Sequence, residues 1–286
     1  MKSAVSRVVV AVSIVAALGA TAACGGSGDD GKKSAKPGAG SAKGGAAAGR
    51  LEKAALATGD VEGYKVEKPQ KRDASGESAP SAGNGKAAPA ACAPLASLLS
   101  AGSGPGPGFG PGSKPATSPK LKAHVSRILT GTDDKDRTTT HVGLSAYAEA
   151  DAERLMADLR AASTSKECAT FHVGDHRYVG VRPLPAPGKS SKPGKSSKPR
   201  NPVTGDEVVS YKLAHPKGEY VARRAVTVVR NGGTLAVFDA SNLYDPEGVQ
   251  QDREAERNGM EGVGTPKADE DPKVAAAIVD AQLGKL

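Results

Sequence analysis

Four long stretches of this chain are too poor in apolar side chains to take part in a hydrophobic core. Glycine, proline, serine, alanine and lysine dominate them, and none shows the apolar periodicity of a helix or a strand. Such segments bury too little apolar surface to offset the conformational entropy that ordering would cost. We therefore expect a flexible linker over residues 24–50 and disordered insertions near 68–91, 100–120 and 183–204.

The rest of the chain must supply the core, and it has few aromatic side chains with which to do so. The 286 residues include no Trp, three Phe and six Tyr, against 36 Gly and 20 Pro. Aromatic side chains bury the largest areas, so the core must rest on aliphatic residues. We expect one domain within residues 51–286, because the segments between the insertions together amount to about one ordinary domain.

The first 23 residues have the layout of a signal peptide. Lys2 and Arg7 form a basic segment, and an almost uninterrupted run of apolar or small residues follows from Val8 to Ala23. The run is short and rich in small residues, whereas a membrane span needs about 20 apolar residues. The pattern therefore predicts a secretory signal peptide over residues 1–23.

A cysteine stands where this signal peptide would be cleaved. The segment Thr21-Ala22-Ala23-Cys24, followed directly by a Gly-rich stretch, resembles the bacterial lipobox. The resemblance implies a fatty acyl group such as palmitate on Cys24 and a place on the extracytoplasmic face of the cell membrane. Two or three acyl chains would hold the protein at this cell surface, since a single chain binds only weakly. The alternative is an ordinary signal peptide cleaved near Ala23, with Cys24 incidental.

Two further cysteines belong to the expected domain. In an exported protein, Cys92 and Cys168 are most simply explained as one structural disulfide, which typically contributes about 2–4 kcal/mol. A zinc site is the first alternative, but no His lies at ligand spacing to complete a tetrahedral shell. A catalytic thiol is the second, but a lone thiolate outside the cell oxidises readily.

The formal net charge of +8 is concentrated in part in one loop without acidic residues. A hexapeptide, Gly-Lys-Ser-Ser-Lys-Pro, is repeated over residues 188–193 and 194–199. A solvated loop is the simplest interpretation, although such a loop near a membrane could contact anionic lipids or acidic wall polymers. Nucleic acid is not an expected partner, because export separates the two and no aromatic residues lie between the basic ones. The basic residues of the loop are Lys189, Lys192, Lys195, Lys198 and Arg200.

The pattern of apolar residues predicts an α+β fold with an antiparallel sheet. Neighbouring strands pair through short turns, of which Asn231-Gly232 is the clearest hairpin signal, and helices lie between groups of strands. The expected helices are Leu51–Thr58, Cys92–Leu99, Ala148–Ala162 and Lys273–Leu283. The expected strands are Leu121–Thr130, Thr138–Tyr147, one or two within Phe171–Val181, then Glu207–Leu213, Val221–Arg230 and Thr234–Ala240, with a short extended piece at Val61–Val66.

The order of these elements resembles that of a known sensor domain. The helix over 148–162 with Cys168 after it, the hairpin over 224–237 and the closing helix at 278–286 resemble the extracellular sensor domain of actinobacterial PknH-type serine/threonine kinases. Lipoproteins without a kinase carry similar domains. The resemblance, over residues 51–286, implies an antiparallel sheet with packed helices and a cleft that binds a ligand. Those kinase domains usually have two disulfides and a Trp, whereas this chain has one cysteine pair and no Trp.

The sequence contains no recognisable motif for catalysis or for metal binding. His172 and His176 lie four residues apart, but Gly174 and β-branched neighbours argue against the helix that would align them. Asp133, Asp134 and Asp136 have basic residues between them and no later Glu, which favours an ordinary turn over a Ca²⁺ loop. We therefore predict no cofactor, no metal ligand and no catalytic residue.

The expected function is non-catalytic. We predict a membrane-anchored domain that binds an unknown envelope ligand or protein, in the manner of a sensor. A structural protein that contacts the cell envelope through its basic loop is the first alternative, and a hydrolase whose catalytic groups converge from distant positions is the second.

Overall fold

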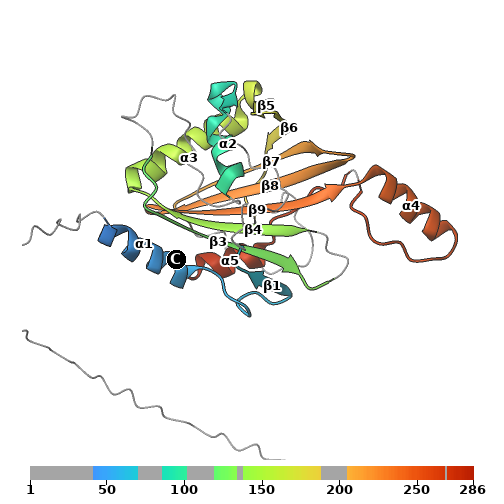
Figure 1. Cartoon of the computed structure of the whole chain (residues 1–286), viewed down its shortest axis with the longest axis horizontal. Helices are drawn as coiled ribbons and strands as arrows, with labels where there is room; N and C mark the ends of the chain where they lie inside the picture. Colours follow the sequence, from blue (N-terminus) through green and yellow to red (C-terminus); the bar gives the residue numbers. More distant parts are fainter. Residues whose placement is uncertain (1–40, 70–85, 102–118, 134–137, 188–204, 268) are drawn as a thin grey trace, which may run out of the picture. The chain divides into compact units, whose positions relative to one another are not determined.

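The structure is a computed structural model that describes residues 41–69, 86–101, 119–133, 138–187, 205–267 and 269–286. Within these residues nine strands form one antiparallel sheet in the order β1-β3-β4-β9-β8-β7-β6-β5-β2 (Figure 1). The predicted α+β class is confirmed. The strands are Tyr64–Glu67 (β1), Ala87–Ala88 (β2), Ala123–Gly131 (β3), Thr139–Ala146 (β4), Thr170–Val173 (β5), His176–Pro183 (β6), Glu207–Lys217 (β7), Tyr220–Asn231 (β8) and Thr234–Tyr244 (β9).

The three longest strands, β7, β8 and β9, are joined by tight turns. Gly232 in the predicted Asn-Gly turn has a φ angle of +54°, which glycine adopts without steric cost. Successive side chains of a strand point to opposite faces of the sheet. Val228 and Val229 therefore contribute to two different cores, one on each face.

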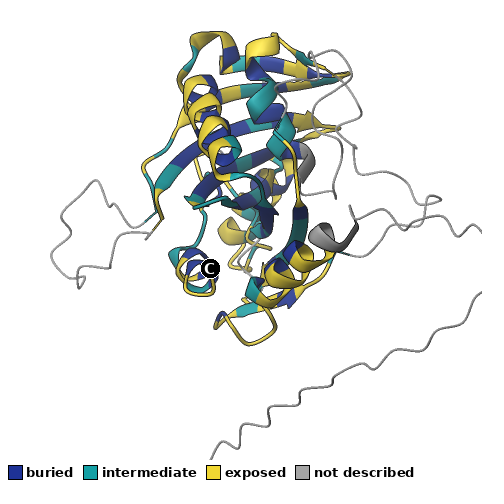
Figure 2. Cartoon of the chain, turned by 90° about the vertical axis from the view of Figure 1, so that its left-hand side faces the viewer, coloured by how far each residue is buried: buried dark blue, intermediate teal, exposed yellow. Residues whose placement is uncertain are grey.

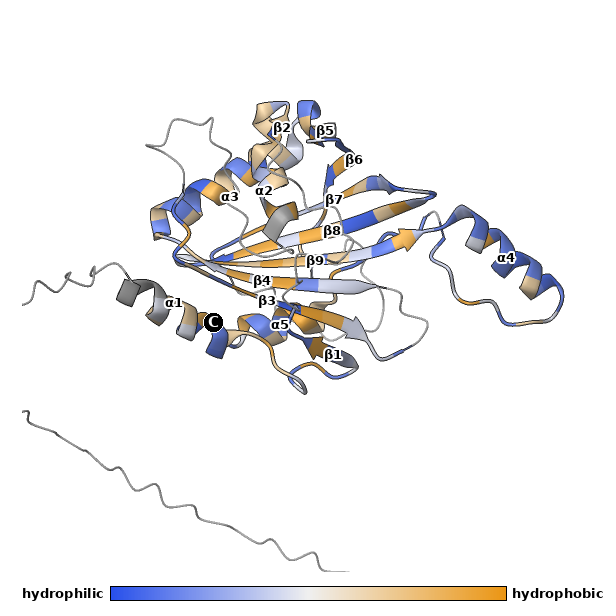
Figure 3. Ribbon diagram, viewed as in Figure 1, coloured by the Kyte–Doolittle hydropathy of each residue, from blue (hydrophilic) through white to orange (hydrophobic). Residues whose placement is uncertain are grey.

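Two pairs of helices cover the two faces of the sheet (Figure 1). Helices α2 (Ala93–Ala101) and α3 (Glu149–Thr164) pack on one face, which we call the α2/α3 face. Helices α1 (Ser41–Ala54) and α5 (Ala276–Leu283) pack on the other, the α1/α5 face. A further helix, α4 (Pro246–Arg257), follows β9 and is almost entirely hydrophilic (Figure 3).

The core of the α2/α3 face contains the only disulfide of the described residues. Leu155, Met156 and Leu159 of α3 pack among the apolar side chains of β6 to β9, and buried positions follow the strands and the helix faces that meet them (Figure 2). Cys92 and Cys168 are bonded, with Cα atoms 5.5 Å apart, and both are fully buried. The predicted pair is therefore present, and it ties the segment before α2 to the turn after α3.

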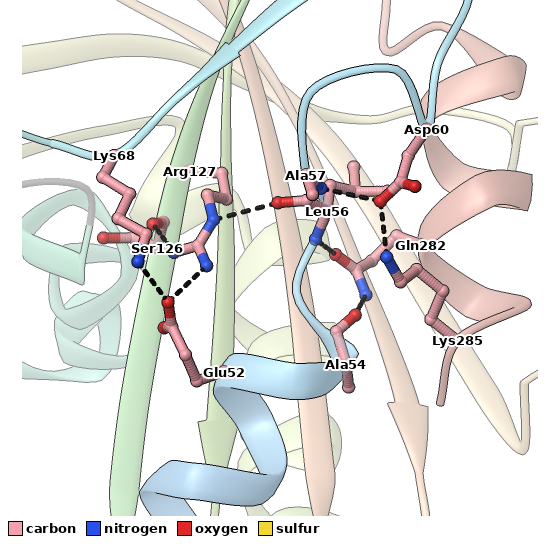
Figure 4. A network of polar contacts seen from close by, with 10 residues as sticks. All are labelled: Glu52, Ala54, Leu56, Ala57, Asp60, Lys68, Ser126, Arg127, Gln282 and Lys285. Carbon is pink, nitrogen blue, oxygen red and sulfur yellow. Dashed lines mark hydrogen bonds and ion pairs between the residues drawn. The ribbon is translucent and has the colours of Figure 1, made fainter.

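A polar network connects the ends of the domain on the α1/α5 face (Figure 4). Gln282 of α5 is fully buried; its Oε1 accepts from the Leu56 amide at 3.3 Å and its Nε2 donates to the Ala54 carbonyl at 2.8 Å. Arg127 of β3 donates to the Leu56 carbonyl at 2.9 Å and to Glu52 of α1 at 2.8 Å. The residues after α1 are thereby joined to the closing helix and to β3, the second strand of the sheet.

Two helices differ from the sequence-based expectation. Helix α1 begins at Ser41, inside the stretch expected as a linker, and ends at Ala54, not Thr58. Alanine favours helix but gives little periodic signal, so the packing of Ala47 against the sheet could not be read from the sequence. Helix α4 was not predicted because it buries only Gly248 and Val249. Its start was nevertheless marked by Asp245, whose carboxylate accepts from the Glu247 amide, and by a proline in the first turn.

Several predicted features lie outside the described residues. These are the signal peptide, Cys24 and the linker up to residue 40, most of the three insertions, including the repeated basic segment, and two aspartates of the expected turn. The parts of the insertions outside the described residues are 70–85, 102–118 and 188–204. In the part of the chain that the structure describes, no helix is both long enough and apolar enough to span a membrane.

Candidate functional site

Strand register aligns polar side chains in rows across the α2/α3 face. Tyr211 of β7 pairs with Val226, Val226 with Asp239, and Asp239 with His141 of β4. The preceding row on this face contains Val209, Val228, Val237 and Gly143. From one row to the next, two residues along each strand, the side chains on this face change from mainly valine to mainly ionisable or hydroxyl-bearing residues.

Five polar or aromatic side chains gather where the valines end, and we call them the Arg224 cluster. Arg224 lies one row beyond Asp239, and its Nε donates to Asp239 Oδ1 at 3.0 Å while its Nη2 donates to Oδ2. Burial opposes the charge of Arg224, but the carboxylate of Asp239 raises the pKa of Arg224 above its usual value. The pair is bidentate and its side chains are 15% and 7% exposed, so both groups are held in fixed positions. The cluster consists of Tyr178, Tyr211, His215, Arg224 and Asp239.

Tyr211 lacks the hydrogen bond that its burial would lead one to expect. Its side chain is fully buried, and its hydroxyl has no partner among the described residues. Burial raises the pKa of Tyr211; the nearby Asp239 adds to this rise and Arg224 opposes it. The phenol is therefore neutral, and it is available as a donor or an acceptor to a group that enters the cluster.

His215 lies on the same face, four residues further along β7 than Tyr211. It is 9% exposed, its Nδ1 has no partner in the described part of the chain, and its ring centroid is 5.3 Å from that of Tyr178. Burial, followed by the charge of Arg224, lowers the pKa of His215 to about 4. The imidazole is therefore neutral near pH 7, and one of its nitrogens has no hydrogen bond.

A small pocket adjoins the cluster. Ser126 and Gly143 line it from β3 and β4, Val237 and Asp239 line it from β9, and Leu98 of α2 forms its wall. Its cavity volume is about 10 Å³, which is room for about one water molecule. Asp239 belongs both to the pocket and to the ion pair, so a molecule in the pocket would lie directly beside the Arg224 cluster. His141 and Val142 complete the lining.

The histidines and the aspartate that the sequence disfavoured as metal ligands lie outside the Arg224 cluster. His172 is exposed on β5, and His176 is the first residue of β6, across the turn that contains Gly174. Asp133 lies in the bend after β3, far along the chain from both cysteines. No three potential ligands among His, Cys, Asp and Glu come together as a metal site within the described residues.

The sequence did carry a signal for the site. Leu235 and Val237 alternate with residues of the other face, and the alternation predicts an apolar residue at 239, where the chain has an aspartate. Arg224 and Tyr211 likewise occupy inward positions of predicted strands. A charged residue at an inward strand position is costly unless it is paired, which makes it a candidate for function.

The comparisons with known proteins name no relative of established function. No family model matches the chain, and no curated protein matches it. Among solved structures, an uncharacterized protein of Mycobacterium smegmatis, the Rv0999 ortholog, is similar with a TM-score of 0.30 and 13% identity. The match covers 65% of this chain and 78% of that chain. The function must therefore be argued from the site itself.

Proposed function

We propose that the protein is a lipid-anchored extracytoplasmic lipoprotein whose domain binds a small ligand on the α2/α3 face without transforming it. One observation carries the binding role: Tyr211 Oη and His215 Nδ1 are buried without partners on the same face as the Arg224–Asp239 pair, and Asp239 also lines a small pocket. A buried polar group without a hydrogen bond costs about 1–3 kcal/mol. Polar groups kept at that cost support a ligand site on this face, and the resemblance to a sensor domain agrees with this role.

The binding role is tested by NMR titration of the full chain, purified in detergent, with a mixture of small fragments. We expect shifted amide signals around Tyr211, Arg224 and Asp239. Tyr211→Phe should reduce these shifts, whereas Tyr244→Phe, which removes a hydroxyl from the α1/α5 side of β9, should leave them unchanged. Shifts confined to the α1/α5 face would contradict the proposal.

The anchor rests on the signal peptide and on the lipobox that ends in Cys24. Replacing Cys24 with Ala removes the thiol that would be acylated, so the protein should move from the membrane fraction to the medium. Ser27→Ala is the matched control and should stay with the membrane. Mass spectrometry of the mature N-terminal peptide checks the modification directly, and an unmodified cysteine there would refute the anchor.

A second candidate role is contact with the cell envelope, which the acid-free basic segment over residues 188–199 favours. Deleting this segment distinguishes the two roles. If envelope retention is lost while the NMR spectrum of the domain is preserved, the basic segment is the interaction element. If retention is unchanged and the fragment shifts persist, ligand binding on the sheet is the better description.

A further inference from the structure

We propose that helix α4 and the loop after it form a docking arm for a second copy of this chain. The arm comprises residues 245–265, which we call the α4 arm, and it binds the basic repeat over residues 188–199 of the other molecule. This contact goes beyond the proposed ligand binding and does not depend on it, because the α4 arm contains no residue of the Arg224 cluster.

Helix α4 has almost no packing partner. It lies beyond the end of β9, away from both helix pairs (Figure 1), and it buries only Gly248 and Val249. An isolated helix of this length is marginally stable in water, because most helical stability in proteins comes from packing. Nearly all of its surface is therefore free for a partner.

The loop after α4 is folded back onto the helix by one carboxylate. Asp252 accepts from the amide of Val263 at 2.7 Å and from the amide of Thr265 at 2.6 Å. Gly262 approaches the same group so closely that a Cβ there would lie 2.6 Å from Asp252 Oδ1. The α4 arm thus presents a loop of fixed course, and a preorganised surface loses less conformational entropy on binding.

The fixed loop displays apolar side chains to solvent. Met260 is 60% exposed and Val263 is 67% exposed, which makes them the most exposed large apolar side chains of the described residues. Single exposed apolar residues are ordinary on protein surfaces. Two on one short loop, held by Asp252, offer apolar contacts that a partner can cover.

Charge identifies the partner of the α4 arm. Residues 245–265 contain six acidic and two basic residues, a net charge of −4, in a chain whose formal net charge is +8. Glu247, Glu254 and Glu256 are exposed and form no ion pair with any described residue. Residues 188–199 contain four lysines and no acidic residue. Complementary charge of this kind steers association and selects the partner.

The spacing of the charges also agrees. Glu247 and Glu254 lie on one face of α4, seven residues and therefore about 10.5 Å apart along the helix axis. The lysines of the repeat recur every three residues, which corresponds to about 9 Å in an extended, proline-rich chain. Successive lysines can therefore pair with successive carboxylates, while the prolines and lysine methylenes cover the apolar loop. These lysines are Lys189, Lys192, Lys195 and Lys198.

The α4 arm cannot receive the basic segment of its own chain. Residues 188–204 connect β6 to β7 at the end of the sheet where β7 begins, whereas α4 follows β9 at the other end, where Tyr244 pairs with Val221. Strand β7 separates the two ends by roughly 35 Å. A segment that leaves at Pro187 and returns at Gly205 reaches at most about 30 Å. The contact therefore forms between two molecules.

The test is zero-length cross-linking of the full chain in detergent, with unlabelled and ¹⁵N-labelled protein mixed in equal amounts. A carbodiimide joins a lysine to a carboxylate that it contacts, and mass spectrometry shows whether the two joined peptides come from different molecules. We expect mixed-isotope pairs that join the lysines of residues 188–199 to Glu247, Glu254 or Glu256. Their yield should fall by about fivefold or more when the ionic strength is raised from about 0.05 M to about 0.5 M.

One pair of variants tests the apolar part of the contact without altering any group that is cross-linked. Met260→Ser/Val263→Ser changes exposed side chains, so it should fold and should lower the yield of mixed-isotope pairs by about threefold or more. Leu243→Ser, which alters a side chain on β9 that is 42% exposed, is the matched control and should leave the yield unchanged. Equal yields from the two variants would overturn the docking arm.

Deletion of residues 188–199 identifies the segment that binds. It should abolish the mixed-isotope pairs of the α4 arm, and pairs that persist through other lysines would refute the proposed occupant. Cross-links of the α4 arm that contain only one isotope would place the contact within a chain, and an absence of cross-links to the α4 arm would show that it does not dock. None of these results bears on the ligand binding, which the NMR titration measures separately.

Discussion

The two faces of the sheet carry two polar networks that differ in how completely their hydrogen bonds are formed. On the α1/α5 face, Gln282 is fully buried and uses both ends of its amide, and Arg127 donates to two backbone carbonyls and to Glu52 (Figure 4). On the α2/α3 face, the Arg224–Asp239 pair is equally well fixed, but the neighbouring Tyr211 and His215 each have a buried polar atom without a partner.

The difference separates a complete hydrogen-bonded network from one with unused hydrogen-bonding capacity, which the proposed binding role requires. Most buried polar groups in native proteins are hydrogen-bonded, so each exception calls for an explanation. The partners of Gln282 are backbone groups at and just after the end of α1, which explains why this network joins the ends of the domain. The Arg224–Asp239 pair joins only the neighbouring strands β8 and β9, and Asp239 also lines a pocket.

The largest expected effect comes from breaking the buried ion pair. Asp239→Ala leaves the charge of Arg224 in a largely buried site, which should cost about 3–5 kcal/mol in the free energy of unfolding. Denaturant titration measures it. The double variant Arg224→Met/Asp239→Leu removes both charges and should fold with nearly the stability of the unaltered protein. A cost of Asp239→Ala below about 1 kcal/mol would mean that the pair behaves like an exposed one.

The second largest expected effect is on the pH dependence of stability. His215 should make the free energy of unfolding fall as the pH is lowered. Because burial lowers the pKa of His215 to about 4, the folded state disfavours its protonation while the unfolded state accepts a proton near pH 6.5. The contribution of His215 to the free energy of unfolding is therefore fully present above about pH 6.5. On the order of 2–3 kcal/mol of it is lost as the pH falls towards 4.

Two variants separate the contribution of His215 to stability from that of the carboxylates, which titrate in the same pH range. His215→Leu should flatten the fall in stability between pH 6.5 and 4. His172→Gln, which alters an exposed histidine, should leave the fall unchanged. An unchanged slope in His215→Leu would show that the imidazole is hydrated in the folded protein.

The sequence predicted the fold more fully than it predicted either network. Alternation of apolar residues located the strands except β2 (Ala87–Ala88), which lies within the stretch expected as an insertion near 68–91. The expectation of export, together with two cysteines, predicted the Cys92–Cys168 bond. The contacts of Gln282 could not be predicted, because its partners lie more than two hundred residues away and are backbone atoms. Asp239 could have been noticed as a charge at an inward strand position. That Arg224 neutralises it depends on the register between β8 and β9, which the sequence does not give.

Removing a hydrogen-bonded group on the α1/α5 face should cost less than breaking the ion pair. Gln282→Leu keeps the size of the side chain but leaves the Leu56 amide and the Ala54 carbonyl without partners, so we expect a loss of about 1–3 kcal/mol. Gln251→Leu on the exposed side of α4 is the control and should change stability little. Equal stabilities of the two variants would mean that water replaces Gln282, and the contrast between the faces would then be weaker.

The smallest expected effect is a gain in stability, whereas Asp239→Ala and Gln282→Leu should lose stability. It therefore tests the contrast between the two polar networks most directly. Tyr211→Phe removes a buried hydroxyl that has no partner, so thermal or denaturant unfolding should show unchanged or higher stability, by at most about 1 kcal/mol. Tyr244→Phe on the other face provides the reference for loss of a phenol hydroxyl. A loss of stability in Tyr211→Phe beyond that reference would show that the hydroxyl is already hydrogen-bonded to ordered water. Only His215 would then distinguish the α2/α3 network from the complete one, and the case for a ligand site on this face would lose its fully buried hydroxyl.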